Sequence, residues 1–183
     1  MPSLNSILAA IGILCFCAAS VCAAIDLLSA HPPKKGEWGA GWLLAAGCVS
    51  LLAVLVLHGA NTGSVPLFNR FDVLTVYGVS LTVAALCLLA RHRARGVLAI
   101  LAPYVTLLLI AGFPAVDVKT GPVPHQIPSV ALLLHLAIAF VGYSLFSLAS
   151  ILACAYLVQD RNLKRRQFGV VFERLPALET LDY

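Results

Sequence analysis

The feature that most constrains this chain is a long apolar segment, Ser129–Asp160, with the sequence SVALLLHLAIAFVGYSLFSLASILACAYLVQD. It exceeds the roughly 20 apolar residues that an α-helix needs to cross the hydrocarbon core of a bilayer. One ionisable side chain, His135, lies inside the apolar run. Because an ionisable group in or near hydrocarbon is costly, His135 is a functional candidate whose partner has to be identified.

Four further segments are apolar and long enough to predict membrane-spanning helices. They are Asn5–Ala30, Trp38–Ala60, Phe71–Ala90 and Gly96–Phe113. Only 11% of the 183 residues are charged, whereas a soluble domain carries roughly 25%. The sequence therefore predicts an all-α fold, a polytopic bundle of about five membrane-spanning helices with lipid as its main solvent. No Lys or Arg precedes the first segment, and its apolar run exceeds a usual signal-peptide core, so we expect it to be retained.

The cations lie on alternate sides of these helices. One set of loops and the tail contain Lys34, Lys35, Arg91, Arg93, Arg95, Arg161, Lys164, Arg165 and Arg166. The other loops contain only Arg70 and Lys119. By the positive-inside rule the N-terminus is outside and the C-terminus cytoplasmic. We divide the chain into a helix bundle, residues 1–160, and a basic, amphipathic cytoplasmic tail, residues 161–183.

This topology puts three of the five histidines on the outer side. His58 ends the second helix, His125 lies in an outer loop, and His135 lies about one turn outside the hydrocarbon if the span is counted back from Val158. An imidazole at a helix end can also simply reach interfacial water, which is the alternative for His58. His31 and His92 lie among the cytoplasmic cations.

One face of the last helix combines a ligand-type residue with small and aromatic residues. At 100° per residue this face contains His135, Ala139, Gly142, Tyr143, Phe146 and Ser150. Ordinary helix packing explains small residues and serines at such positions, and an interhelical hydrogen bond would explain His135. The alternative is a haem site, because a neutral imidazole binds haem iron well.

Other site chemistries are not indicated. All six cysteines lie within apolar runs and none forms a CxxC, CxxCH or zinc pattern, so we interpret them as small buried hydrophobes. Nothing resembles a nucleic-acid-binding motif, a phosphate-binding loop or a Ser/His/Asp set, and we expect no nucleic-acid partner.

The C-terminal third resembles the CcsA/HemX-type cytochrome c assembly proteins. The match is carried by Leu134-His135-Leu136, Gly142-Tyr143, the segment AYLVQDRNLK at residues 155–164 and the tail LPALETLDY at residues 175–183. These are similar to the family's LHxxxAxxxY helix, its Y/LLxQxxxLK segment and its LPxLExLdxLsY stretch. Leu57-His58 and the segment NRFD at residues 69–72 match its N-terminal half more loosely.

The resemblance implies a multi-pass protein of the bacterial inner (plasma) membrane that handles haem at the outer face. It implies that His135 is an axial ligand of the iron of a non-covalent, b-type haem. His58 would be a second cofactor-binding residue, and Tyr143 and Phe146 would line or support the pocket. The implied partners are apocytochrome c, other cytochrome c maturation subunits and the lipid bilayer.

Two functions follow. The first is binding or delivery of haem for attachment to apocytochrome c. Thioether formation needs the partner's CxxCH thiols and reduced haem, so the chain would be at most part of a haem lyase or cytochrome c synthase system. The family's tryptophan-rich motif, of the type WGxxWxWDxKE, and its second outer histidine would lie further on. We therefore expect the chain to correspond to the N-terminal part of such a protein, a truncated gene product or a split subunit.

The second function is that of a non-catalytic assembly subunit or a small permease without a cofactor. Transporters usually show internal repeats or broken helices near the midplane. Here Pro103 is the only mid-helix break, and we expect no charged residue at bilayer depth to bind an ion or relay a proton.

Overall fold

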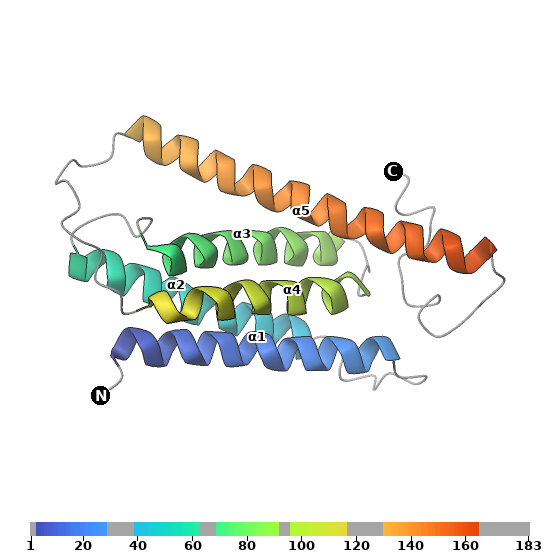
Figure 1. Ribbon diagram of the computed structural model, residues 1–183, viewed down its shortest axis with the longest axis horizontal. Helices are drawn as coiled ribbons and strands as arrows, with labels where there is room; N and C mark the ends of the chain where they lie inside the picture. The colour runs from blue at the N-terminus through green and yellow to red at the C-terminus, as the bar shows by residue number, and fades with distance from the viewer. Residues whose placement is uncertain (1–2, 29–38, 63–68, 92–95, 117–129, 165–183) are drawn as a thin grey trace.

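The computed structural model describes residues 3–28, 39–62, 69–91, 96–116 and 130–164, and these form five α-helices (Figure 1). The helices are α1 (Leu4–Leu28), α2 (Gly39–Thr62), α3 (Arg70–Arg91), α4 (Gly96–Gly112) and α5 (Val130–Lys164), and α4 continues into a 3₁₀ turn, η2 (Phe113–Ala115). Each is long and apolar enough to cross a membrane, and the described residues contain no strand. The predicted all-α bundle of about five spans is therefore confirmed.

The helices begin and end within a few residues of the predicted bounds. The largest difference is in α5, which continues beyond Asp160 to Lys164. Its last turn is supported by an ion pair in which Lys164 Nζ donates to Asp160 Oδ2 over 2.7 Å, since residues four apart lie on the same helix face. Helix α4 passes through Pro103 without interruption.

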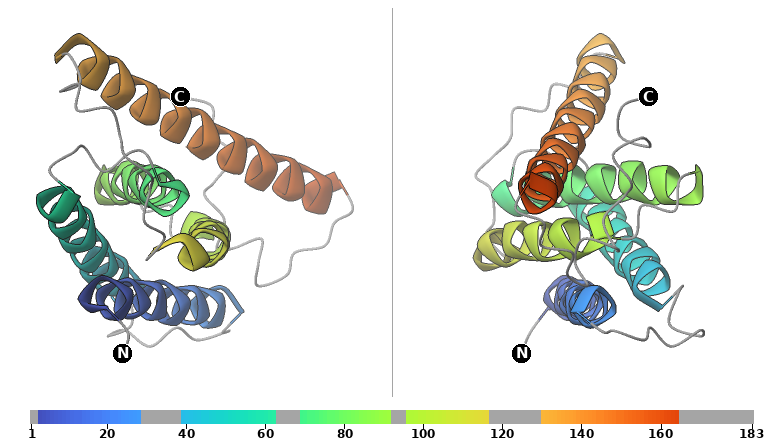
Figure 2. Two further views of the ribbon diagram at one scale, coloured as in Figure 1. Left: turned by 60° about the vertical axis from the view of Figure 1, so that its left-hand side comes forward. Right: turned by 90° about the vertical axis from the view of Figure 1, so that its right-hand side faces the viewer.

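Successive helices run in opposite directions, so the start of α1, the end of α2 and the start of α3 lie at the same end of the bundle (Figure 1). The end of α4 and the start of α5 lie there too. We call this the N-terminal end of the bundle. Helices α1 to α4 pack together, and α5 lies across α3 and, less extensively, α4. The first turns of α5 stand away from the other helices in both views of Figure 2.

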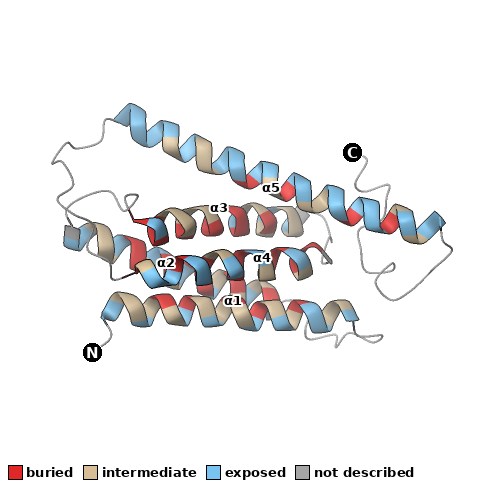
Figure 3. Cartoon of the chain, in the orientation of Figure 1, coloured by how far each residue is buried: buried red, intermediate tan, exposed pale blue. Residues whose placement is uncertain are grey.

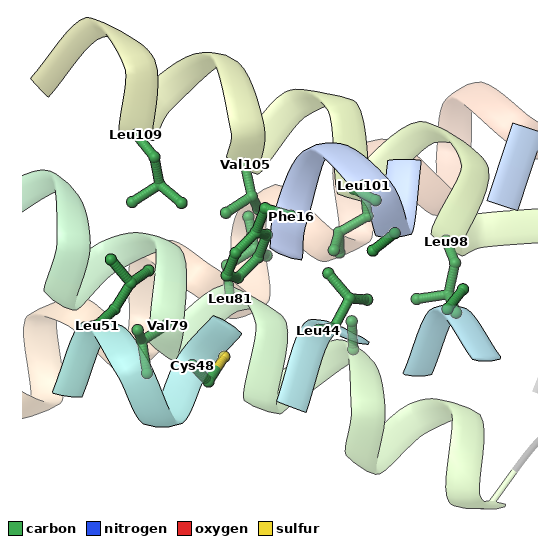
Figure 4. Close-up of a cluster of buried hydrophobic side chains, with 14 of the residues drawn as sticks. Phe16, Leu44, Cys48, Leu51, Val79, Leu81, Leu98, Leu101, Val105 and Leu109 are labelled. Carbon is green, nitrogen blue, oxygen red and sulfur yellow. The ribbon is translucent and has the colours of Figure 1, made fainter. Parts of the chain in front are cut away.

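The core lies between α1, α2, α3 and α4. Large apolar side chains from all four helices meet there, including Phe16, Leu51, Leu81 and Leu101, each with no exposed surface (Figure 4). Outward-facing positions on the same helices are also apolar, as at Val49 and Leu107. Apolar side chains on both faces are what a helix in lipid requires, because its outer surface meets acyl chains instead of water.

Close approach of α1 and α2 depends on glycine. A Cβ atom at Gly47 would lie 2.8 Å from ring atoms of Phe16 and 3.3 Å from Cβ of Cys15. A Cβ at Gly12 would lie 2.9 Å from Leu51. The ring of Phe16 is fully buried, so moving it away from an added methyl would disturb the core. Small residues at helix contacts allow this approach and increase the dispersion contacts that hold membrane helices together.

We expect Gly47→Ala to destabilise the bundle by about 1–3 kcal/mol, because the added methyl overpacks the contact with Phe16. The measurement is unfolding of the purified protein by SDS in mixed micelles. Gly142→Ala is the matched control, because a Cβ there meets nothing within 4 Å. Equal stability of the two variants would contradict this account of the α1–α2 contact.

The orientation of the bundle in the membrane is predicted from the cations and is testable in cells. In a variant whose native cysteines are replaced by alanine, we expect a membrane-impermeant thiol reagent to label Ser3→Cys in intact spheroplasts. Lys164→Cys, which is exposed at the opposite end of the bundle, should be labelled only after permeabilisation. The reverse pattern would overturn the predicted topology.

Candidate functional site

A histidine and a carboxylate form a pair between α2 and α3 at the N-terminal end of the bundle. Nδ1 of His58, near the end of α2, lies 3.0 Å from Oδ1 of Asp72, in the first turn of α3. The side chains are 15% and 2% exposed, respectively. An ionised carboxylate only accepts hydrogen bonds, so the Nδ1 of His58 carries the proton and Nε2 is the acceptor nitrogen of the ring.

Asp72 is a candidate functional residue to which the sequence alone assigned no role. It is the third residue of a helix long enough to span the membrane, and it is 1% exposed. The expectation that no charged residue lies at bilayer depth stays a prediction, because Asp72 lies in the first turn of α3, at the end of the bundle. A signal was present in the sequence, because an acidic residue in the first turn of a helix is stabilised by the helix dipole. Its pairing with His58 required the packing of α2 against α3.

Asn69 fixes the start of α3, and with it the position of Asp72. Its Oδ1 accepts a hydrogen bond from the backbone N–H of Phe71 over 3.3 Å, which makes it the N-cap of α3. Its Nδ2 donates to the backbone carbonyl of Ala115 in η2. Beside this contact, a Cβ at Gly112 would lie 3.4 Å from Cα of Phe71. The start of α3 is thus held against the end of α4.

His135, unlike the partly buried His58, lies on an exposed surface. It is exposed on the second turn of α5, and its imidazole makes no side-chain hydrogen bond with another described residue. Tyr143 and Phe146 are 66% and 75% exposed. The buried positions of α5 are instead Ser144, Leu148, Ala155 and Gln159 (Figure 3). The face that contains His135 therefore points away from the other helices of the chain.

The structure does not bring the two candidate ligands together. Within the described part of the chain, no group of three or more His, Cys, Asp and Glu side chains is arranged to hold a metal ion. His58 pairs with Asp72 between α2 and α3, and His135 lies on α5, although both helix ends are at the N-terminal end of the bundle (Figure 1). His31, His92 and His125 lie outside the described residues.

A cluster of hydroxyls holds α5 against the bundle one turn beyond Tyr143. The Tyr77 hydroxyl on α3 forms a hydrogen bond with Ser147 Oγ on α5. The Tyr104 hydroxyl on α4 lies 3.5 Å from that of Tyr77. Hydroxyls that bond between membrane helices fix their register. The exposed face of α5 therefore keeps a defined rotation relative to α3.

We expect Asn69→Ala to destabilise the protein by about 1–2 kcal/mol, because both the N-cap and the bond to Ala115 are lost. Asn69→Ser separates the two effects, since a serine caps the helix but is too short to reach η2. Its stability, measured by SDS unfolding, should fall between those of the wild type and Asn69→Ala. A fully stable Asn69→Ala variant would show that neither bond contributes.

The chain is similar to known proteins over most of its length. The family described as "Cytochrome C assembly protein" matches residues 43–183. Protein HemX of Brevibacillus brevis is 28% identical over 134 residues, which are 71% of this chain and 48% of that protein. Protein HemX of Bacillus subtilis (strain 168) is 26% identical over 160 residues, 87% of this chain and 57% of that protein. The chain thus spans about half the length of these curated relatives. No solved structure matches it significantly.

The matched range includes α3, α4, α5 and most of α2, and so contains His58, Asp72 and His135. The five apolar helices make the chain a multi-pass membrane protein, and the match supports a role in cytochrome c biogenesis. Because the match covers well over half of the sequence, the chain belongs to the cytochrome c assembly protein family.

Proposed function

We propose that the protein binds haem at the extracytoplasmic face of the bacterial inner membrane and delivers it for attachment to apocytochrome c. The observation that carries this proposal is the exposed face of α5, where His135 lies above Gly142, Tyr143 and Phe146 in a chain of this family. The cation pattern, which predicts an outside N-terminus, supports an extracytoplasmic location for the N-terminal end of the bundle.

The residues of this face suit a flat, amphiphilic macrocycle. The imidazole of His135 supplies a nitrogen that binds haem iron as an axial ligand. The surface at Gly142 is open, with no atom within 4 Å of the position of a Cβ. Tyr143 follows Gly142 directly, Phe146 lies about one turn further along, and both are exposed, so their rings are available to pack against a porphyrin. Haem would thus approach α5 from the membrane or its interface without displacing any of the other described helices.

His58 contributes a second imidazole at the same end of the bundle. Histidines that bind metals usually donate their other ring nitrogen to a carboxylate or carbonyl, and the bond from His58 to Asp72 has this arrangement. We propose that His58 also binds haem. The apocytochrome supplies the thiols for the thioether bonds, so this chain acts within a haem lyase or cytochrome c synthase system together with other maturation subunits.

The test is the visible spectrum of the protein purified in detergent with haem supplied. We expect a Soret band in the wild type that is shifted or weakened in His135→Ala, because the iron loses an axial ligand. His135→Gly with added imidazole should recover the wild-type band. His92→Ala is the matched control, since His92 is predicted on the cytoplasmic side, and it should leave the spectrum unchanged.

Two outcomes would reject the proposal for this chain. One is the absence of a Soret band in the wild type. The other is a spectrum of His135→Ala identical to that of the wild type. The first would favour a non-catalytic assembly subunit, and the second would remove His135 from the site.

A further inference from the structure

We propose that Asp72 is the positioning residue of His58. It holds the imidazole in the Nδ1–H tautomer and in one orientation, so that Nε2 is the nitrogen presented to haem iron. This inference rests on the proposed function, because it concerns the same haem site. The contact between His58 and Asp72 carries it, since a carboxylate on the far ring nitrogen fixes both the tautomer and the basicity of a histidine ligand.

The buried carboxylate of Asp72 needs partners that compensate for its lost hydration. Removing a carboxylate from water is energetically unfavourable unless nearby charges or hydrogen bonds offset the lost hydration. Asp72 is 1% exposed in a helix whose other surfaces are largely apolar. Its position in the first turn of α3 gives it the favourable end of the helix dipole, and the Nδ1–H of His58 gives it a hydrogen bond. The helix dipole and the hydrogen bond from His58 together offset the desolvation of Asp72. The buried position of Asp72 therefore depends in part on His58.

The start of α3, which bears Asp72, is held in place by contacts with the end of α4. A positioning group has to be held by elements that do not move with the ligand. Asp72 follows the N-cap Asn69 by three residues, and Asn69 is bonded to both the start of α3 and the carbonyl of Ala115. Phe71, next to Asp72, is 1% exposed and packs against Gly112 of α4. The carboxylate is therefore fixed to α3 and α4, whereas the imidazole comes from α2.

The contact with Asp72 changes the electron donation of the His58 imidazole. A hydrogen bond from Nδ1–H to an ionised carboxylate increases the electron donation of Nε2. Stronger axial donation stabilises ferric relative to ferrous iron, and second-shell hydrogen bonds are one of the means by which a protein sets haem potentials. Removing the charge at residue 72 should therefore raise the reduction potential of bound haem. Loss of a merely structural contact between α2 and α3 would not predict this shift.

The first experiment uses the haem-free protein, so that it does not depend on haem binding. Nitrogen NMR of ¹⁵N-histidine-labelled protein in detergent micelles identifies the tautomer of each imidazole, and His58→Gln assigns the His58 signals by their loss. We expect the wild type to show the Nδ1–H tautomer for His58. Asp72→Leu should give a mixture of tautomers, and Asp72→Glu should restore the wild-type signal.

The second experiment is a redox titration of the haem-loaded protein. We expect a positive shift of the potential in Asp72→Asn and recovery in Asp72→Glu. If Asp72→Leu fails to fold, Asp72→Asn still tests the loss of charge, because it preserves the shape of the side chain. Thr75→Val is the matched control, because Thr75 lies one turn along α3, is fully buried, and its hydroxyl has no hydrogen-bond partner among the described residues. It should leave the potential unchanged.

The outcomes distinguish this inference from the proposed function. An Nε2–H tautomer in the wild type, or an unaltered His58 signal in Asp72→Leu, overturns the role of Asp72 whatever the haem experiments give. Haem binding with an unchanged potential in Asp72→Asn overturns that role and leaves the proposed function standing. A wild-type protein that binds no haem rejects both, while the NMR result still reports whether the pair exists.

Discussion

A polar group at membrane depth has no water to bond with, and the rest of the structure depends on this constraint. The described segments satisfy it by forming long helices, in which almost every backbone N–H and C=O finds its partner within the same segment. Hydroxyl side chains follow the same rule. Several donate to the carbonyl four residues earlier in their own helix, namely Ser20, Thr82, Thr106, Ser144 and Ser150. Polar bonds between helices are consequently few, and each one fixes a particular geometry.

Each of these side-chain hydrogen bonds links a particular pair of neighbouring elements. Ser50 of α2 donates to the carbonyl of Leu8 in α1, and Ser20 of α1 bonds Thr106 of α4. Tyr77 connects α3 to α5, while Asn69 connects the start of α3 to η2. Glycine contacts bring α1 and α2 close enough for their large side chains to interdigitate. The pair of His58 and Asp72 belongs to this set, but it differs from the others because it joins an imidazole to a carboxylate.

The two histidines of the proposed haem site have opposite environments, and these suit different tasks. The His58 side chain is only 15% exposed and contacts a buried carboxylate, which in the proposed arrangement restricts its tautomer and its movement. His135 is exposed on a face that the other described helices leave uncovered. An exposed ligand is accessible to an arriving molecule, whereas a restrained ligand sets the electronic properties of what it binds. Both kinds of ligand suit a protein that receives haem and passes it on.

The sequence by itself determined the number, approximate bounds and apolar character of the helices. The length of an apolar segment is a local property, and it alone decides whether the segment can cross the hydrocarbon core of a bilayer. It also determined which residues share a face of α5, since helical periodicity is fixed by backbone geometry. Only the tertiary structure decided which way that face points. Ser144 and Leu148 are buried against the bundle, whereas His135, Tyr143 and Phe146 are exposed. In lipid both faces of a helix are apolar, and hydrophobic pattern does not separate buried from exposed positions as it does in water. The partner of His58 was likewise decided in three dimensions, because Asp72 is 14 residues away along the chain and meets it only where α2 packs on α3.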